Sequence, residues 1–433
     1  MMKLFHTIRH VNIVLVLLLF FVSGCGSGGG SGESSTQPAQ TTNNSQQSQW
    51  QLSELGKIQS SGLNQPNLSA IMGNNGLHLA YFASEGGAYT INHHVFDPAF
   101  LQENSTKTPV ITLQTPQQDL GLALISQDTP LVIYQGGGPS TCGQTKHSDM
   151  MASILENSQW IEYTAAIGRV DRNAIVNDGI AGRSIDVKVD TQNQIHMCCQ
   201  FFYEGCDSMN QTYPDLWYFQ FSPHNNTIPK TVEGNTYGAV NIQNTAGTYC
   251  TMALNNFDQP YIFYYYEKKL PNNEFGLKVA IRNDPDDWGI QWVKEQTTVG
   301  DISAAWNNNE HYMAVAYYET NAQSLIYAEN TGNGWETKFF DDSCKCGNYC
   351  RLAFDMDGNP IIAYRAEKSH SGNPLEKLKI ARRTEQGWTK ELIENNNNIG
   401  YYNSILVDDD STIYIITYSR ETHGIYVLVS EGI

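Results

Sequence analysis

Carboxylates and phenols recur beside one repeated position in this 433-residue chain. Asp or Tyr stands just before, or at the start of, several short apolar runs, at Asp119, Tyr249, Asp301, Tyr349 and Tyr402. Charged residues follow the next apolar run in several copies, at Glu204, Glu267, Glu319 and Arg365. Carboxylates beside phenols suit the binding of a sugar or a cation, and a solvated acidic rim is the alternative.

Two arginines break the repeated pattern. Arg351 occupies a slot that holds Ser, Thr or Gly in the other copies, and Arg183 lies one position before the same slot. A buried guanidinium needs a partner, because an unpaired charge is costly to bury. It would bind a ligand carboxylate through two hydrogen bonds, or it would pair with Asp186, Asp301 or a neighbouring Glu.

The elements that must position these residues form seven copies of one unit. A small residue and alternating apolar residues open each copy, at 69–71, 121–123, 184–186, 251–253, 303–305, 351–353 and 404–406. Aromatic-rich runs follow, at 79–81, 132–134, 200–202, 262–264, 315–317, 362–364 and 416–418. Short runs of this kind, separated by turn residues, are typical of strands. The sequence therefore predicts an all-β, seven-bladed β-propeller with four-stranded antiparallel blades.

The two ends of the repeat region complement each other. The last copy stops at Ser430–Ile433, where a Trp-containing strand is expected, as from Trp388 to Leu392. The missing strand stands at the other end, at Trp50–Leu55. Pairing of this first strand with the last blade would close the ring and leave no open sheet edge.

The blade pattern at Leu352–Trp388 and Ser324–Trp335 resembles that of exported bacterial propellers related to sialidases, with their Asp-box repeats. The Asp-box order itself is only echoed, at Thr331–Trp335 and Thr384–Trp388. The resemblance implies a glycosidase that holds a substrate carboxylate with three arginines, beside a Tyr paired with a Glu. Under it, Arg183, Arg351 and Arg365 should converge, although the Phe-Arg-Ile-Pro motif of that family is absent.

The N-terminus is read as an export signal. Basic residues precede the apolar run Val11–Val22, which is short for a membrane span. Val22-Ser23-Gly24-Cys25 resembles the lipobox of bacterial lipoproteins, which implies lipidation of Cys25. We expect a signal peptide at 1–24, a flexible tether at 25–49 and the propeller at 50–433. The expected location is the cell envelope, on the outer membrane of a Gram-negative cell.

Without Cys25, eight of the nine cysteines remain, and an even number in an exported chain predicts disulfides. Cys350 is expected to bond Cys344 or Cys346, Cys142 to meet Cys206, and Cys250 to lie near Cys198 or Cys199. The alternative is a metal site at Cys344, Cys346 and Cys350, which lacks a second ligand pair at zinc spacing.

The formal charge of −18 argues against nucleic acid as a partner. No cofactor or metal is expected, because no nucleotide-binding, hydrolase or metalloprotease motif occurs. The leading expectation is binding of an extracellular glycan or protein partner without catalysis, on a protein held to the lipid membrane through Cys25. The alternatives are a sialidase-like glycoside hydrolase and a structural subunit of an envelope complex.

Overall fold

The computed structural model describes residues 50–58, 67–85, 88–97, 106–113, 119–136, 149–166, 169–172, 175–203, 214–223, 230–233, 244–269, 272–395 and 397–430. Contacts group residues Ser48–Ile433 into one compact unit, apart from Met1–Gln47. The signal peptide, the lipobox with Cys25 and the tether lie outside the described residues. Within the described residues there is no helix long and apolar enough to cross a membrane.

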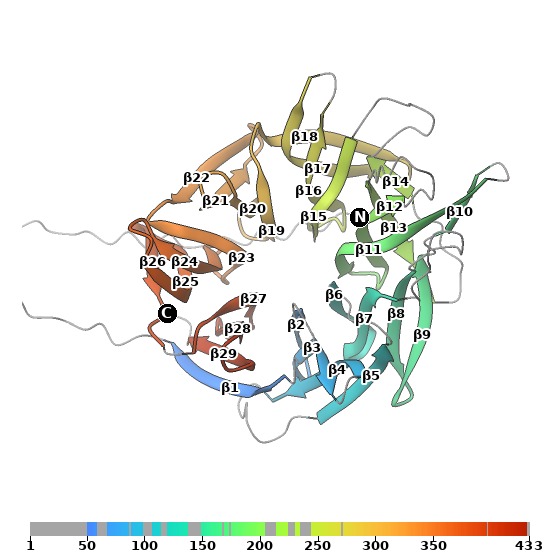
Figure 1. The fold of residues 1–433 in the computed structure, drawn as a ribbon, viewed down its shortest axis with the longest axis horizontal. Coiled ribbons are helices and arrows are strands. Elements are labelled where there is room, and N and C mark those ends of the chain that lie inside the picture. Colours follow the sequence, from blue (N-terminus) through green and yellow to red (C-terminus); the bar gives the residue numbers. More distant parts are fainter. Residues whose placement is uncertain are drawn as a thin grey trace, which may run out of the picture. The chain divides into compact units, whose positions relative to one another are not determined.

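Seven antiparallel sheets follow one another around a centre, as predicted (Figure 1). The first contains β2 (Leu68–Gly73), β3 (Gly76–Glu85), β4 (Ala88–Phe96) and β5 (Thr106–Leu113). The second contains β6 (Leu120–Ile125), β7 (Thr129–Gln135), β8 (Met150–Glu156) and β9 (Gln159–Ala166), with the 3-10 turn η1 (Ser126–Asp128). The third contains β10 (Arg169–Arg172), β11 (Ile175–Val189), β12 (Ile195–Tyr203), β13 (Asp215–Phe221) and β14 (Lys230–Glu233).

The remaining blades are regular. The fourth contains β15 (Asn244–Leu254), β16 (Pro260–Lys268), β17 (Glu274–Asp284) and β18 (Asp287–Glu295). The fifth contains β19 (Val299–Asn307), β20 (Tyr312–Glu319), β21 (Ser324–Asn330) and β22 (Trp335–Asp341). The sixth contains β23 (Cys344–Phe354), β24 (Pro360–Ser369), β25 (Pro374–Thr384) and β26 (Gly387–Leu392), and the seventh β27 (Ile399–Val407), β28 (Ile413–Ser419) and β29 (Gly424–Ser430). Only the third blade departs from four strands, because β10 pairs with the start of the long β11.

The ring closes where the sequence predicts. β1 (Gln51–Lys57) pairs antiparallel with β29, with Gln51 opposite Val429 and Ser53 opposite Val427. Trp50 packs into the core shared by the sixth and seventh blades, and its indole N–H donates to Glu391 Oε2 at 3.1 Å. The first described strand therefore completes the last blade, and the seventh sheet has no open edge at this place.

Aromatic side chains join neighbouring blades. Four outer-strand Trp residues pack against the preceding blade: Trp160 on His93, Trp288 on Tyr218, Trp335 on Phe263 and Trp388 on Phe339. Ring centroids in these pairs are 4.3–5.4 Å apart. Such pairs bury large apolar area, so the repeated Trp fixes the angle between blades.

The innermost strands carry bulges that position the channel residues. Register shifts occur in β11, β15, β19, β23 and β27. Four residues at these bulges have left-handed backbones: Ser184, Tyr249, Tyr349 and Tyr402, with φ of 49–55°. A bulge bends its strand and redirects a side chain, so each repeat can present a different group at the same place.

Candidate functional site

A channel of about 1060 Å³ lies at the centre of the ring of sheets. Residues of all seven inner strands line it. Six residues singled out from the sequence are among them: Asp119, Tyr249, Asp301, Tyr349, Arg351 and Tyr402. The structure thus brings these six into one cavity, and their role in binding a ligand stays a prediction.

Phenols and guanidinium groups gather where β23 and β27 meet. The rings of Tyr349 and Tyr402 are 4.9 Å apart, and Arg420 Nη2 donates to the Tyr349 hydroxyl at 3.1 Å. Burial raises the pKa of Tyr349, while Arg420 beside it acts in the opposite direction. Burial likewise raises the pKa of Tyr402, whose hydroxyl oxygen has no hydrogen-bond partner among the described residues. Both phenols are therefore protonated at neutral pH.

Arg351 lines the channel beside this cluster. Its Nη1 donates to the carbonyl of Cys350 at 2.7 Å, and within the described chain no carboxylate pairs with it. The expected alternative, a salt bridge to Asp186, Asp301 or a Glu, is not found there. A half-buried guanidinium with unused donors is suited to a ligand anion.

The channel carboxylates also stabilise the backbone. Asp301 Oδ2 accepts the Tyr349 N–H at 2.7 Å, and Asp119 Oδ2 accepts the Ser184 N–H at 3.0 Å. Asp186 accepts with both oxygens: Oδ1 accepts from the Val187 N–H and Lys188 Nζ, and Oδ2 accepts from the Thr251 hydroxyl and the Met252 N–H. These bonds satisfy amides that the bulges leave without a ladder partner. Asp301 keeps one oxygen, Oδ1, without a hydrogen bond in the described structure.

Several predicted site residues lie elsewhere. Arg365 is only 2% exposed, donates to the Ile399 carbonyl and to Asn398, and stacks on Tyr401 at 3.7 Å. It therefore fills the joint between the sixth and seventh blades and does not line the channel with the other predicted residues. Glu267 lies one residue before the end of β16 and Glu319 ends β20; neither lines the channel, and Glu319 accepts the Ala322 N–H. Glu204 and the side chain of Arg183 lie outside the described residues.

Arg420 is the site residue that sequence reasoning missed. It follows β28, in the loop after the second strand of the last blade. The same rule selected Glu319 and Arg365 in earlier blades, so applying it to the seventh copy would have found Arg420.

The cysteines pair differently from the expectation. Cys344 bonds Cys346, whereas Cys350 stays a thiol buried in the same strand. Cys198 and Cys250 are also thiols, but their sulfur atoms lie 3.7 Å apart across the third and fourth blades, so Cys250 lies near Cys198 as predicted. Cys199 is buried in β12, and Cys142 and Cys206 lie outside the described residues.

One group of metal-ligand types occurs in the described residues. Donor atoms of Asp341, Cys344 and Cys346 lie within 4.8 Å of one another. The two sulfurs are bonded to each other, and Asp341 already pairs with Lys379 and Lys390. Two ammonium groups on the only carboxylate oppose a cation there.

No family model and no curated protein matches this sequence. Solved structures do resemble it. A polysaccharide lyase shares 8% identity with a TM-score of 0.54, covering 85% of this chain and 90% of that one. A fungal alcohol oxidase in complex with copper shares 9% identity with a TM-score of 0.51, covering 88% and 76%. An α-L-arabinanase of Penicillium chrysogenum shares 13% identity with a TM-score of 0.49, covering 88% and 97%.

These likenesses show the fold, and they correct one expectation. The sequence predicted a binding module without catalysis, yet the two propellers named above with TM-scores over 0.5 are described as a polysaccharide lyase and an alcohol oxidase. The prediction of a non-catalytic binding protein is therefore wrong. The resemblance to sialidase-type repeats finds no support from sequence families, and what the comparison shows is a β-propeller fold shared with a polysaccharide lyase and an alcohol oxidase.

Proposed function

We propose that this protein is an enzyme that cleaves glycosidic bonds in a carboxylate-bearing glycan, inside the central channel. The observation that carries the proposal is Arg351, a channel guanidinium without a carboxylate partner in the described structure, next to the Tyr349–Arg420 pair. The shared fold with a polysaccharide lyase supports the reaction class.

Carboxylate recognition follows from the local charges. Arg351 can bind a carboxylate through two parallel hydrogen bonds, which fixes the orientation of the sugar as well as holding it. Arg420 adds a second guanidinium at the Tyr349 hydroxyl. The overall charge of the protein, −18, repels an anionic glycan at long range. Binding therefore depends on short-range pairing with these guanidinium groups inside the channel.

Elimination is the reaction that these groups fit best. Tyr349, as phenolate, would remove the proton from the carbon next to the carboxylate. The electron pair forms a C=C bond, the C–O bond to the leaving sugar breaks, and the leaving oxygen takes the proton from the phenol. Arg351 would stabilise the negative charge that develops on the carboxylate. Elimination by Tyr349 and Arg351 does not require a glutamate, and in the described part of the chain no glutamate lines the channel.

Hydrolysis is the second candidate, favoured by Asp301. Its Oδ1 has no hydrogen bond in the described structure, and the residue faces the channel beside Tyr349. It could protonate the leaving oxygen while a tyrosine attacks the sugar. The three-arginine arrangement of sialidases is not supported, because Arg365 is buried away from the channel.

The test is turnover by the purified chain on a panel of uronate- and sialate-containing glycans, with neutral glycans as controls. We expect new reducing ends only with acidic glycans, and loss of this activity in Arg351→Met. Elimination adds the ultraviolet absorbance of an unsaturated sugar, and hydrolysis does not. Equal activity on neutral glycans, or full activity of Arg351→Met, would overturn the proposal.

We also propose that the enzyme is held on the cell envelope by acyl chains on Cys25. The supporting observation is the order of Val22, Ser23, Gly24 and Cys25 after an apolar run. Cys25→Ser should release the protein into the soluble fraction, and mass spectrometry should find the lipid on the wild-type cysteine. A wild-type N-terminus without lipid would contradict the anchor.

A further inference from the structure

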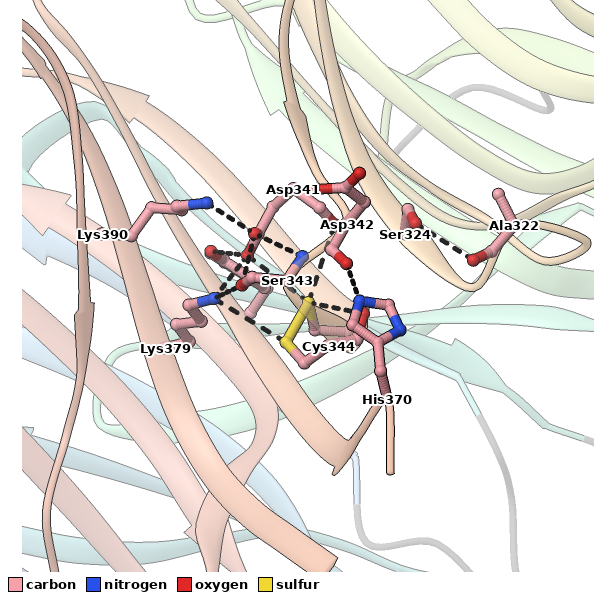
Figure 2. Close-up of a disulfide and its surroundings, with 11 residues drawn as sticks. Ala322, Ser324, Asp341, Asp342, Ser343, Cys344, His370, Lys379 and Lys390 are labelled. Atoms are coloured by element: carbon pink, nitrogen blue, oxygen red, sulfur yellow. Dashed lines mark hydrogen bonds and ion pairs between the residues drawn. A yellow bond between two sulfur atoms is a disulfide. The ribbon is translucent and has the colours of Figure 1, made fainter. Parts of the chain in front are cut away.

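A charged network surrounds the Cys344–Cys346 disulfide at the start of β23 (Figure 2). Asp341 is fully buried and accepts hydrogen bonds from Lys379 Nζ at 2.6 Å, Lys390 Nζ at 3.0 Å and the Tyr364 hydroxyl at 2.7 Å. These contacts hold the pKa of Asp341 well below its usual range, against the effect of burial. The carboxylate is therefore ionised beside the two sulfurs.

The two sulfurs face opposite charges. Lys379 Nζ lies 3.7 Å from Cys344 Sγ, whereas Asp341 Oδ2 lies 3.4 Å from Cys346 Sγ. With the disulfide closed, two ammonium groups share one carboxylate, which leaves an excess positive charge beside Cys344. A thiolate on Cys344 would neutralise that charge, and a thiol on Cys346 would donate to Asp341. The surroundings thus match the reduced pair.

We propose that Cys344 and Cys346 form a redox-active pair that exchanges with dithiol compounds or proteins. A dithiol reductant supplies two electrons and two protons and becomes a disulfide. The Cys344–Cys346 bond breaks, one proton goes to Cys346, and the other is released to solvent because Cys344 remains a thiolate. A disulfide whose reduced form is stabilised in this way is a stronger oxidant than a structural disulfide.

Access to the pair is through the loop that joins β22 to β23. Both sulfurs are buried, but Asp342 and Ser343, which precede Cys344, are exposed. His370, itself exposed, contacts the Asp342 carbonyl and holds this loop down (Figure 2). An attacking thiolate would therefore reach the disulfide when the contact between His370 and the Asp342 carbonyl breaks and the loop moves.

The test is the redox equilibrium of the pair in the full chain. The protein is incubated with graded mixtures of reduced and oxidised dithiothreitol, free thiols are alkylated, and the fragment with Cys344, Cys346 and Cys350 is analysed by mass spectrometry. Lys379→Gln should lower the reduction equilibrium constant about tenfold, the effect of about one pKa unit on a thiolate. Lys390→Gln is the matched control, because Lys390 contacts Asp341 and neither sulfur in the described contacts. This variant should shift the constant much less.

Asp341→Asn should shift the reduction equilibrium constant in the direction opposite to Lys379→Gln, which a general loss of folding would not do. This substitution leaves the ammonium groups of Lys379 and Lys390 without their carboxylate, while the amide oxygen can still accept from the Cys346 thiol. A Cys344 thiolate then becomes their counter-ion, so the reduced form should become more favourable, whereas Lys379→Gln makes it less so. His370→Ala should speed the approach to equilibrium without changing its position. The proposal is overturned if Lys379→Gln and Lys390→Gln shift the constant equally, or if folded wild-type protein keeps the disulfide in every mixture. The readout does not involve glycan cleavage, so it stands or falls independently of the proposed function.

Discussion

Two walls of the channel share one construction and differ in chemistry. The tyrosine wall, from β23 and β27, presents Tyr349, Arg351 and Tyr402, with Arg420 behind them. The plain wall, from β2 and β6, presents small or apolar residues: Ser69, Ala70, Gly121 and Leu122. A Cβ at Gly121 would lie 2.7 Å from Ile133 Cγ1, so packing against the next strand excludes larger groups there. The difference indicates that the repeated scaffold positions the site and that departures from the repeat supply its chemistry.

The largest expected effect is on the tyrosine wall. Tyr349→Phe removes the hydroxyl that Arg420 contacts and should lower glycan cleavage about 10³-fold, the loss expected for a proton-transfer group. Ser69→Ala, on the plain wall, is the matched control and should leave turnover unchanged. Initial rates with the best acidic glycan make the comparison. Equal losses in both variants would show that the walls do not differ in function.

Removal of a carboxylate that accepts a bulge amide should separate an effect on stability from an effect on turnover. Asp301→Ala and Asp119→Ala each remove the acceptor of a bulge amide, of Tyr349 and Ser184 respectively. Each should lower the free energy of unfolding by about 1–3 kcal/mol, measured in urea. Only Asp301→Ala should also reduce turnover, because it displaces Tyr349. If Asp119→Ala were the more damaging to turnover, the site would lie on the other side of the channel.

The pH dependence of turnover tests whether Tyr349 acts as a phenolate. Burial raises the pKa of Tyr349, so at neutral pH only a small fraction is the phenolate that elimination needs. The rate should therefore rise with pH, approaching tenfold per pH unit, until the phenol titrates. Measurement of kcat at several pH values tests this. A rate that falls from neutral to alkaline pH would favour hydrolysis over elimination.

The smallest expected effect concerns acid stability in the first blade, behind the plain wall. His78 and His93 are buried with ring nitrogens 3.0 Å apart, and burial lowers the pKa of His93 from 6.5 to about 3. Burial also lowers the pKa of His78, which Asp128 partly opposes. The unfolded chain therefore takes up protons first as pH falls below 6.5. Stability should be complete above that pH and fall by about 1 kcal/mol per pH unit below it. Urea unfolding of wild type and His93→Gln checks this, with the variant less sensitive to acid.

Sequence patterns predicted the scaffold better than the site. The match between Trp50–Leu55 and Trp388–Leu392 predicted ring closure, because period-two strands with a repeated Trp leave a local signature. Arg365 was predicted to face the channel. Successive residues of a strand face opposite sides of the sheet, so a shift of one residue at the strand end places a side chain between the blades instead. The Cys344–Cys346 pair was missed because bulges in β23 change which side chains face each other, and spacing does not reveal bulges.

The pairing of β1 with β29 has a consequence for biosynthesis. The segment that seals the ring is synthesised long before its partner strand, β29. Until then the nascent protein carries an unpaired border at each end of a growing arc of sheets, where other polypeptides can attach. Stable assembly therefore waits for synthesis of β29, and termination of translation before Gly424 would leave the ring of sheets open.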